Sequence, residues 1–215
     1  MLKNYFKIAV RNLLKNSVFS LINILGLSIG IACCMTILLW VKHEMSYDAH
    51  HVNADNIYGV GTTFINQKEE KSGSGSPSPL GPNLVQEFPE IQTMTRIFRP
   101  FNNDKSIIQL LEDGNIQESF YESNGYAVDS TYFDIFKYEF LKGNPKTALA
   151  EPNTVVLTEP VAAKIFGKQS AINQVVRISN SIGTIDYRVT GVVKKPNNPS
   201  HLNGHFFMSM YSGEL

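Results

Sequence analysis

The run NSVFSLINILGLSIGIACCMTILLWV, from Asn16 to Val41, contains no Asp, Glu, Lys, Arg or His. As a helix with a rise of about 1.5 Å per residue it would extend for roughly 39 Å. This length exceeds the roughly 30 Å of a bilayer hydrocarbon core. The sequence therefore predicts a transmembrane helix over residues 16–42.

Two other interpretations of this run are weaker. The apolar segment of a cleaved signal peptide is about 7–15 residues long and ends at small residues, whereas here MTILLWV follows the small residues Gly30 to Cys33. Cleavage as a lipoprotein at Cys33 would leave an unusually apolar mature N-terminus. An uncleaved anchor is the preferred interpretation.

Basic residues on one side of the run predict its orientation. They are Lys3, Lys7, Arg11 and Lys15, and residues 1–15 contain no acidic residue. Because Lys and Arg near a span are retained in the cytoplasm, we expect the N-terminus inside and residues 47–215 across the membrane. This geometry corresponds to a single-span anchored domain on the far side of the membrane.

The same basic residues suggest how residues 1–15 meet the membrane. Their four-residue spacing places them along one slowly drifting stripe of a helix, with Leu2, Phe6 and Leu13 on the other side. This pattern is typical of an amphipathic helix in the cytoplasmic interface, where it contacts membrane lipid. An ordinary basic flank of a span explains the pattern equally well.

Small residues inside the predicted span suggest that it packs against another helix. Gly26 and Gly30 form a GxxxG motif, and small residues four apart allow a second backbone to approach closely. Asn23 is the one strongly polar side chain of the span and favours a protein-facing position. We expect Gly26, Gly30 and Asn23 to mark a helix-packing face.

The charge of the predicted outer domain excludes one class of partner. The chain has 19 basic and 19 acidic residues, but five of the basic ones and none of the acidic ones fall in residues 1–42. The remainder therefore has a net charge of −5, which gives no electrostatic basis for binding nucleic acid. Both cysteines, Cys33 and Cys34, lie in the span, so the outer domain folds without disulfides.

Short strand-like and helix-like segments alternate over residues 47–215, which predicts one extracytoplasmic domain of the α+β class. Gln67–Pro82 is rich in Gly, Ser and Pro and predicts a polar surface loop. The β-branched run Thr154–Leu157 predicts a strand. Thr158 is expected to cap the helix that follows, and Gly167 to end it.

No catalytic or cofactor-binding pattern stands out. Gly167-Lys168-Gln169-Ser170 resembles the end of a Walker A loop but lacks its first glycine. The segment HLNGH, His201 to His205, lacks the glutamate of the zinc-protease motif. The sequence predicts a nonenzymatic chain with no metal and no cofactor, which does not hydrolyse ATP by itself.

Several blocks together resemble one family. RNLLKNSVFSLINILGLSIGIACCMTILLWVKHEMSYD, residues 11–48, resembles the N-terminal segment and first span of macrolide-exporter-like (MacB/FtsX-type) ABC transporter permeases, most closely the Bacteroidetes-type group. HHVNADNIYGV, residues 50–60, resembles the block after that span. Residues 128–167 and 187–201, ending in YRVTGVVKKPNNPSH, resemble the body of the MacB-like periplasmic core domain.

The resemblance implies a noncatalytic permease subunit of an export or mechanotransmission complex. Its implied partners are a cytoplasmic ABC ATPase, a second permease copy and a periplasmic or outer-membrane protein. Permeases of this type continue to further spans, so we expect the chain to be an N-terminal fragment with an incomplete core domain. The alternatives are a stand-alone membrane-anchored binding or sensor module and, less favoured, an anchored enzyme.

Overall fold

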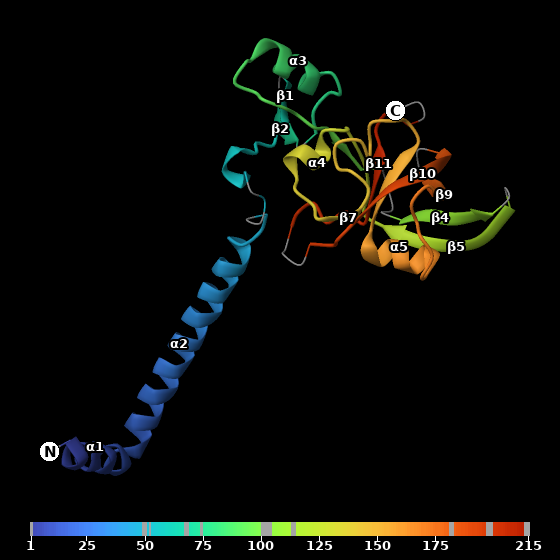
Figure 1. Cartoon of the computed structure of the whole chain (residues 1–215). Helices are drawn as coiled ribbons and strands as arrows, with labels where there is room; N and C mark the ends of the chain where they lie inside the picture. Colours follow the sequence, from blue (N-terminus) through green and yellow to red (C-terminus); the bar gives the residue numbers. More distant parts are fainter. Residues whose placement is uncertain are drawn as a thin grey trace. The chain divides into compact units, whose positions relative to one another are not determined.

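The computed structural model describes residues 2–48, 51, 53–66, 69–73, 75–99, 105–112, 115–180, 183–196 and 200–212. The chain divides into two compact units, Met1–Tyr47 and Asp48–Leu215. The first is helical and the second is built mainly from strands (Figure 1).

The first unit consists of two helices. Helix α1 is Leu2–Lys15 and helix α2 is Ser17–Glu44. The helical path breaks at Asn16, where φ is −116° and ψ is 52°. Within the described residues α2 is the one helix long and apolar enough to cross a membrane, with a mean hydropathy of 2.4. Lys42 and His43 in its last turn complement the negative end of the helix dipole.

The second unit is organised around one mixed sheet. Within the described residues it has nine strands, eight of which follow the order β3-β6-β11-β8-β10-β9-β4-β5, while β7 also pairs with β10. The strands are β3 (Ile97–Phe98), β4 (Lys105–Glu112), β5 (Asn115–Ser123), β6 (Gly125–Val128), β7 (Phe140–Lys142), β8 (Thr154–Thr158), β9 (Val175–Asn180), β10 (Gly183–Val193) and β11 (Phe206–Ser209). The pairs β6–β11 and β8–β10 are parallel, and the other pairs are antiparallel.

Strand β8 shows why the middle of this sheet is apolar on both sides. All five of its residues are buried. Val155 and Leu157 point into one core cluster and Val156 points into the other, because successive side chains of a strand alternate between faces. Strand β11 repeats the pattern. Strands covered on both faces have continuous apolar sequences, which explains TVVLT and FFMS.

A helix contributes to the cluster on each face. Helix α5 (Glu159–Phe166) adds Val161 and Ile165 to the first core cluster. Helix α4 (Tyr132–Ile135) adds Tyr132 and Phe133 to the second cluster, which is rich in aromatic rings. In Figure 1, α5 lies beside β4 and β5, and α4 lies near β11. The predicted α+β class, with one apolar N-terminal helix before a sheet-rich domain, is confirmed.

One predicted loop is wrong in part. Residues 69–73, placed in the polar loop Gln67–Pro82, form strand β2 and pair with β1 (Thr62–Asn66) in a two-stranded antiparallel sheet. Pairing along a hairpin satisfies backbone groups whatever the side chains are, so a polar strand leaves a weak sequence signal. The 3-10 helix Ala54–Asn56 precedes this hairpin, and α3 (Leu80–Glu87) follows it.

The predicted cap of α5 is also wrong. Thr158 stands at the cap position, but its side chain makes no capping hydrogen bond. Its buried hydroxyl instead donates to the carbonyl oxygen of His205 at 2.8 Å. A contact 47 residues distant therefore replaces the local one. The predicted end of the helix is confirmed, because the chain leaves α5 at Gly167 with φ 58°.

Candidate functional site

Helix α1 contains all four residues predicted to lie at the membrane interface. Lys3, Lys7, Arg11 and Lys15 fall within an arc of about 120° at 100° per residue. The large apolar residues of α1, including Phe6 at 73% and Leu14 at 74% exposure, are open to the surroundings. The helix is therefore amphipathic and its apolar side chains are not covered by the rest of its unit. The membrane-interface role of the basic residues stays a prediction.

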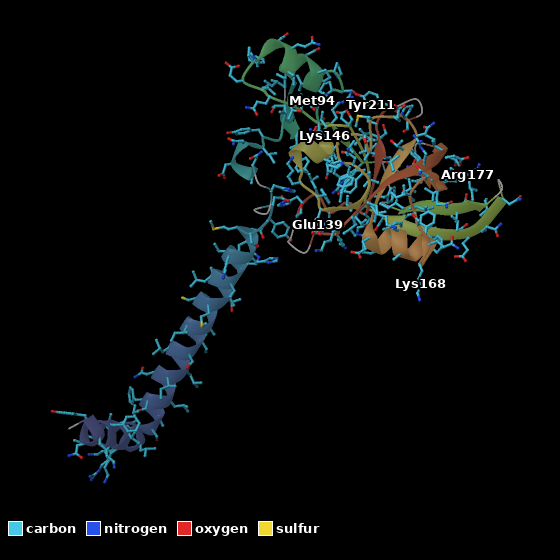
Figure 2. The ribbon with its side chains drawn as sticks, in the orientation of Figure 1. Met94, Glu139, Lys146, Lys168, Arg177 and Tyr211 are labelled. Carbon is cyan, nitrogen blue, oxygen red and sulfur yellow. The ribbon has the colours of Figure 1, made fainter. Side chains whose placement is uncertain are left out.

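Helix α2 brings the three predicted packing residues onto one face. Asn23, Gly26 and Gly30 lie within an arc of about 60°. A Cβ added at either glycine would have no heavy atom within 4 Å, so the pair leaves a shallow notch on the helix surface. The side chains of α2 project outward on all sides and none is buried (Figure 2). The hydroxyl of Thr36 donates a hydrogen bond to the carbonyl oxygen of Ala32, one turn earlier, at 2.8 Å.

The second unit contains a polar group that we call the Asp48 cluster: Asp48, Ser200, His201 and Leu202. The hydroxyl of Ser200 donates to Oδ1 of Asp48. Oδ2 lies 2.8 Å from Nδ1 of His201 and 3.5 Å from its backbone nitrogen. Ser200 Oγ also accepts from the backbone N–H of Leu202 at 3.0 Å. Both carboxylate oxygens are therefore engaged by one short turn of chain.

The cluster holds Asp48 in its charged form. Burial alone would raise the pKa of Asp48, but the hydrogen bonds from Ser200 and His201 outweigh burial and lower the pKa below its usual value. An ionised carboxylate only accepts hydrogen bonds, so Nδ1 of His201 carries the proton in this contact.

Aspartate, serine and histidine are also the residue types of a hydrolytic triad, but their connectivity here is different. In a triad the serine hydroxyl donates to histidine, and histidine donates to aspartate. Here Asp48 sits between the other two, and the Ser200 hydroxyl donates to the carboxylate. Among the residues that the structure describes, no histidine accepts a hydrogen bond from the Ser200 hydroxyl. The arrangement joins two segments of chain and does not form a nucleophile.

A second polar group surrounds Glu122 near the end of β5. Its carboxylate lies 2.9 Å from Lys164 Nζ and 2.8 Å from Nδ1 of His205. These residues border a shallow pocket of about 120 Å³ with Thr158 and Lys195. His201 and His205, weighed as metal ligands in HLNGH, are thus held by different carboxylates. Within the described ranges no group of three His, Cys, Asp or Glu side chains could hold a metal ion.

Sequence reasoning did not find the Asp48 cluster. Asp48 and Ser200 are 152 positions apart, and neither lies in a motif with a recognisable spacing. Both do fall at the ends of blocks that carry the family resemblance, SYD and NPSH. Their place in these two blocks was the one sequence feature that could have pointed to the cluster.

Comparisons with known proteins agree with this architecture. The family profile of the MacB-like periplasmic core domain matches residues 20–213. No curated protein matches the chain. A domain assigned to a permease protein from Porphyromonas gingivalis is similar in fold, with a TM-score of 0.51, 20% identity, and coverage of 66% of this chain and 56% of that one.

Two further solved structures are similar to the chain at lower scores. The periplasmic region of MacB from Actinobacillus actinomycetemcomitans has 20% identity and a TM-score of 0.39, over 60% of this chain and 53% of that one. The extracellular domain of the ABC-type transporter YknZ from Gram-positive bacteria has 17% identity and a TM-score of 0.35. The match covers 49% of this chain and 50% of that one. The chain thus spans about half of each solved relative.

The profile covers most of the chain and includes both the apolar helix from residue 20 and the sheet domain. The chain belongs to the family defined by the MacB-like periplasmic core domain.

Proposed function

We propose that this chain is the N-terminal part of a noncatalytic permease subunit in an ABC-type export or mechanotransmission complex. The observation that supports it is the single family match over residues 20–213, which joins the apolar helix α2 and the sheet domain. In this role ATP-driven motion inside the cell moves α2, and the periplasmic domain responds outside the membrane. The chain transmits motion and performs no chemistry.

The orientation in the proposal follows from charge. Helix α1 carries four basic residues and no acidic residue in its first turn, and it precedes the span. Basic residues near a span favour the cytoplasmic side. Helix α1 would lie in the inner leaflet interface with its basic stripe toward lipid head groups and the cytoplasm. The domain from Asp48 onward would then be periplasmic.

The face of Asn23, Gly26 and Gly30 would pack against a neighbouring span. Two glycines four apart let helix backbones approach closely, and an amide side chain can hydrogen-bond across the contact. A span of the second permease copy is one such neighbour. A periplasmic or outer-membrane protein would complete the complex beyond the outer domain.

Contact between α1 and a cytoplasmic ABC ATPase can be tested directly by photocrosslinking. Asn4 lies about 100° from Lys3 and therefore inside the basic stripe, whereas Phe6 lies about 60° outside it on the apolar side. We would replace each in turn with photoreactive p-benzoylphenylalanine in native cells. Irradiation of the Asn4 variant should give a covalent adduct with an ATPase that contains a Walker A sequence, identified by mass spectrometry.

The Phe6 variant is the matched control, because its reactive group should meet lipid. It should give no ATPase adduct. Adduct formation at Asn4 alone supports the permease role and argues against a stand-alone anchored module. If Asn4 forms no ATPase adduct, or if both positions form it equally, the proposed contact is wrong.

A further inference from the structure

We infer that the Asp48 cluster is the tether through which movement of the membrane span reaches strand β11, inside the sheet of the periplasmic domain. This inference deepens the proposed permease function and rests on it. It assigns Asp48, Ser200 and His201 as positioning residues for transmission. The geometry on either side of Asp48 supports the assignment.

The chain between α2 and Asp48 has little slack. Only Met45, Ser46 and Tyr47 separate the end of the helix from the aspartate. Their backbone N–H groups donate to carbonyls of the last helical turns at 2.9, 3.1 and 3.3 Å, and the Ser46 hydroxyl donates to His43 at 2.6 Å. A connector of three hydrogen-bonded residues therefore leaves little free chain between the span and Asp48.

The side chain of Asp48 then joins a distant part of the domain, while its backbone carbonyl accepts a bond from the N–H of His51 at 3.2 Å. Its backbone is left-handed, with φ 55°, and its carboxylate accepts bonds from Ser200 and His201. A carboxylate held by several donors at both oxygens resists a pull from more than one direction. Asp48 is also the first residue of the second unit.

The segment from Ser200 leads directly into strand β11. Leu202 packs against the second core cluster, and its carbonyl accepts a bond from the Tyr138 hydroxyl at 3.4 Å. Gly204 is packed so closely that an added Cβ would lie 2.5 Å from the ring of Phe207. His205 donates its N–H to Asn124 at 2.9 Å. This segment cannot move far without moving its neighbours.

Strand β11 lies inside the sheet, between β6 and β8. Phe206, Phe207, Met208 and Ser209 are all buried, with at most 1% exposure. A displacement applied at Asp48 therefore passes through about six residues to a fully buried strand of the domain. Strand β11 is hydrogen-bonded to both neighbouring strands. Because the core around it is close-packed, a displacement of β11 should move these strands with it.

Single-molecule force measurement on the full chain in a lipid nanodisc tests the tether. Handles are attached at Met45→Cys, on the exposed connector, and at Tyr211→Cys, after β11, with Cys33→Ser and Cys34→Ser to remove the native thiols. The parent should show one main extension as the domain unfolds. Asp48→Ala should add an earlier extension of roughly 10 Å at lower force, as the chain straightens between Asp48 and His51, because His51 is buried and packs against Phe136.

Ser200→Ala and His201→Ala should show the same early extension, because they remove the partners of the carboxylate. Asp55→Asn is the matched control, since Asp55 is exposed just beyond His51 in the chain and should behave as the parent. Should Asp48→Ala lose the main unfolding step, His201→Ala decides the question, because that side chain is 70% exposed.

The tether is refuted if none of the three variants shows the early extension, or if Asp55→Asn shows it too. This outcome leaves the ATPase contact of α1 untouched. Conversely, a missing ATPase adduct at Asn4 would refute the proposed ATPase contact without altering the force record. The two failures are therefore distinguishable.

Discussion

Arg96 and Asp129 form a bidentate ion pair that joins the segment after α3 to the end of β6. Nη2 of Arg96 lies 2.7 Å from Oδ1, and Nε and the backbone N–H bond Oδ2 at 3.0 and 2.7 Å. The Asp129 side chain is only 4% exposed. Arg96 Nη1 also reaches the Ser78 hydroxyl at 3.0 Å. One guanidinium thus secures the residues on both sides of α3 to the sheet.

Arg96→Ala should lower the free energy of unfolding by about 3 kcal/mol, because it leaves a buried carboxylate without its cation. The effect stays at the low end of the usual range since the backbone N–H of residue 96 still bonds Asp129. Urea denaturation of the full chain in detergent measures it. Arg177→Ala removes the exposed pair with Asp186 and should change the midpoint little. Equal losses in the two variants would contradict the distinction.

Thr158 offers a second test, because its hydroxyl acts as a donor to His205 and not as a helix cap. Thr158→Ser keeps a donor and should be the mildest change. Thr158→Val should cost about 1 kcal/mol. Thr158→Asp, a good capping residue in general, should destabilise most, because it buries an acceptor against a carbonyl. Denaturant midpoints rank the three variants. If the Asp variant were as stable as the Ser variant, residue 158 would act as a helix cap after all.

The elements that could be predicted from the sequence are those set by local signals. Thr154–Leu157 was predicted as a strand because β-branched residues favour a pleated, covered surface, and it forms β8. The end of α5 at Gly167 was predicted because glycine readily adopts positive φ. These signals are local. The alternation of short strand-like and helix-like segments predicted the α+β class, which the structure confirms.

The remaining features depend on distant parts of the chain. Thr158 has the composition of a cap, yet a carbonyl from the loop before β11 competes successfully for its hydroxyl. Strand β2 consists of polar residues whose pairing is set by the hairpin. Asp48 meets Ser200 only after the whole domain has folded. Long-range contacts of this kind have no fixed spacing in a sequence.

Acid should destabilise the outer domain. Burial would raise the pKa of Glu122, but hydrogen bonds from Lys164 and His205 outweigh it and lower the pKa below 4.5. Arg177 lowers the pKa of Asp186 below 3.8. A carboxylate whose folded pKa is lowered stabilises the fold above its unfolded pKa, and that stability is lost as the pH falls through the folded pKa.

Urea midpoints should therefore be similar at pH 7 and pH 5 and fall below about pH 4. Glu122→Gln should lower the midpoint at neutral pH and reduce the further fall in acid, because one of the titrating groups is gone. A domain that became more stable between pH 5 and pH 3 would contradict the predicted sign.

The glycine face of α2 predicts the outcome of a membrane crosslinking assay. Gly26→Leu with Gly30→Leu should weaken crosslinking to a neighbouring span several-fold, since leucine side chains fill the notch that close packing requires. Leu25→Ala, about 130° from the middle of this face, is the matched control. Membrane insertion should be unaffected, as the span becomes more apolar. Unchanged crosslinking in the glycine variant would remove these residues from the packing face.

Thiol labelling of the anchored chain tests the central claim most directly. In a Cys33→Ser, Cys34→Ser background, one cysteine is placed at Asn4 in α1 or at Lys168, which extends from the end of α5 away from the domain (Figure 2). A membrane-impermeant maleimide should label Lys168→Cys in intact spheroplasts and Asn4→Cys only after permeabilisation. Labelling of Asn4→Cys with protection of Lys168→Cys would place the domain in the cytoplasm and contradict the account.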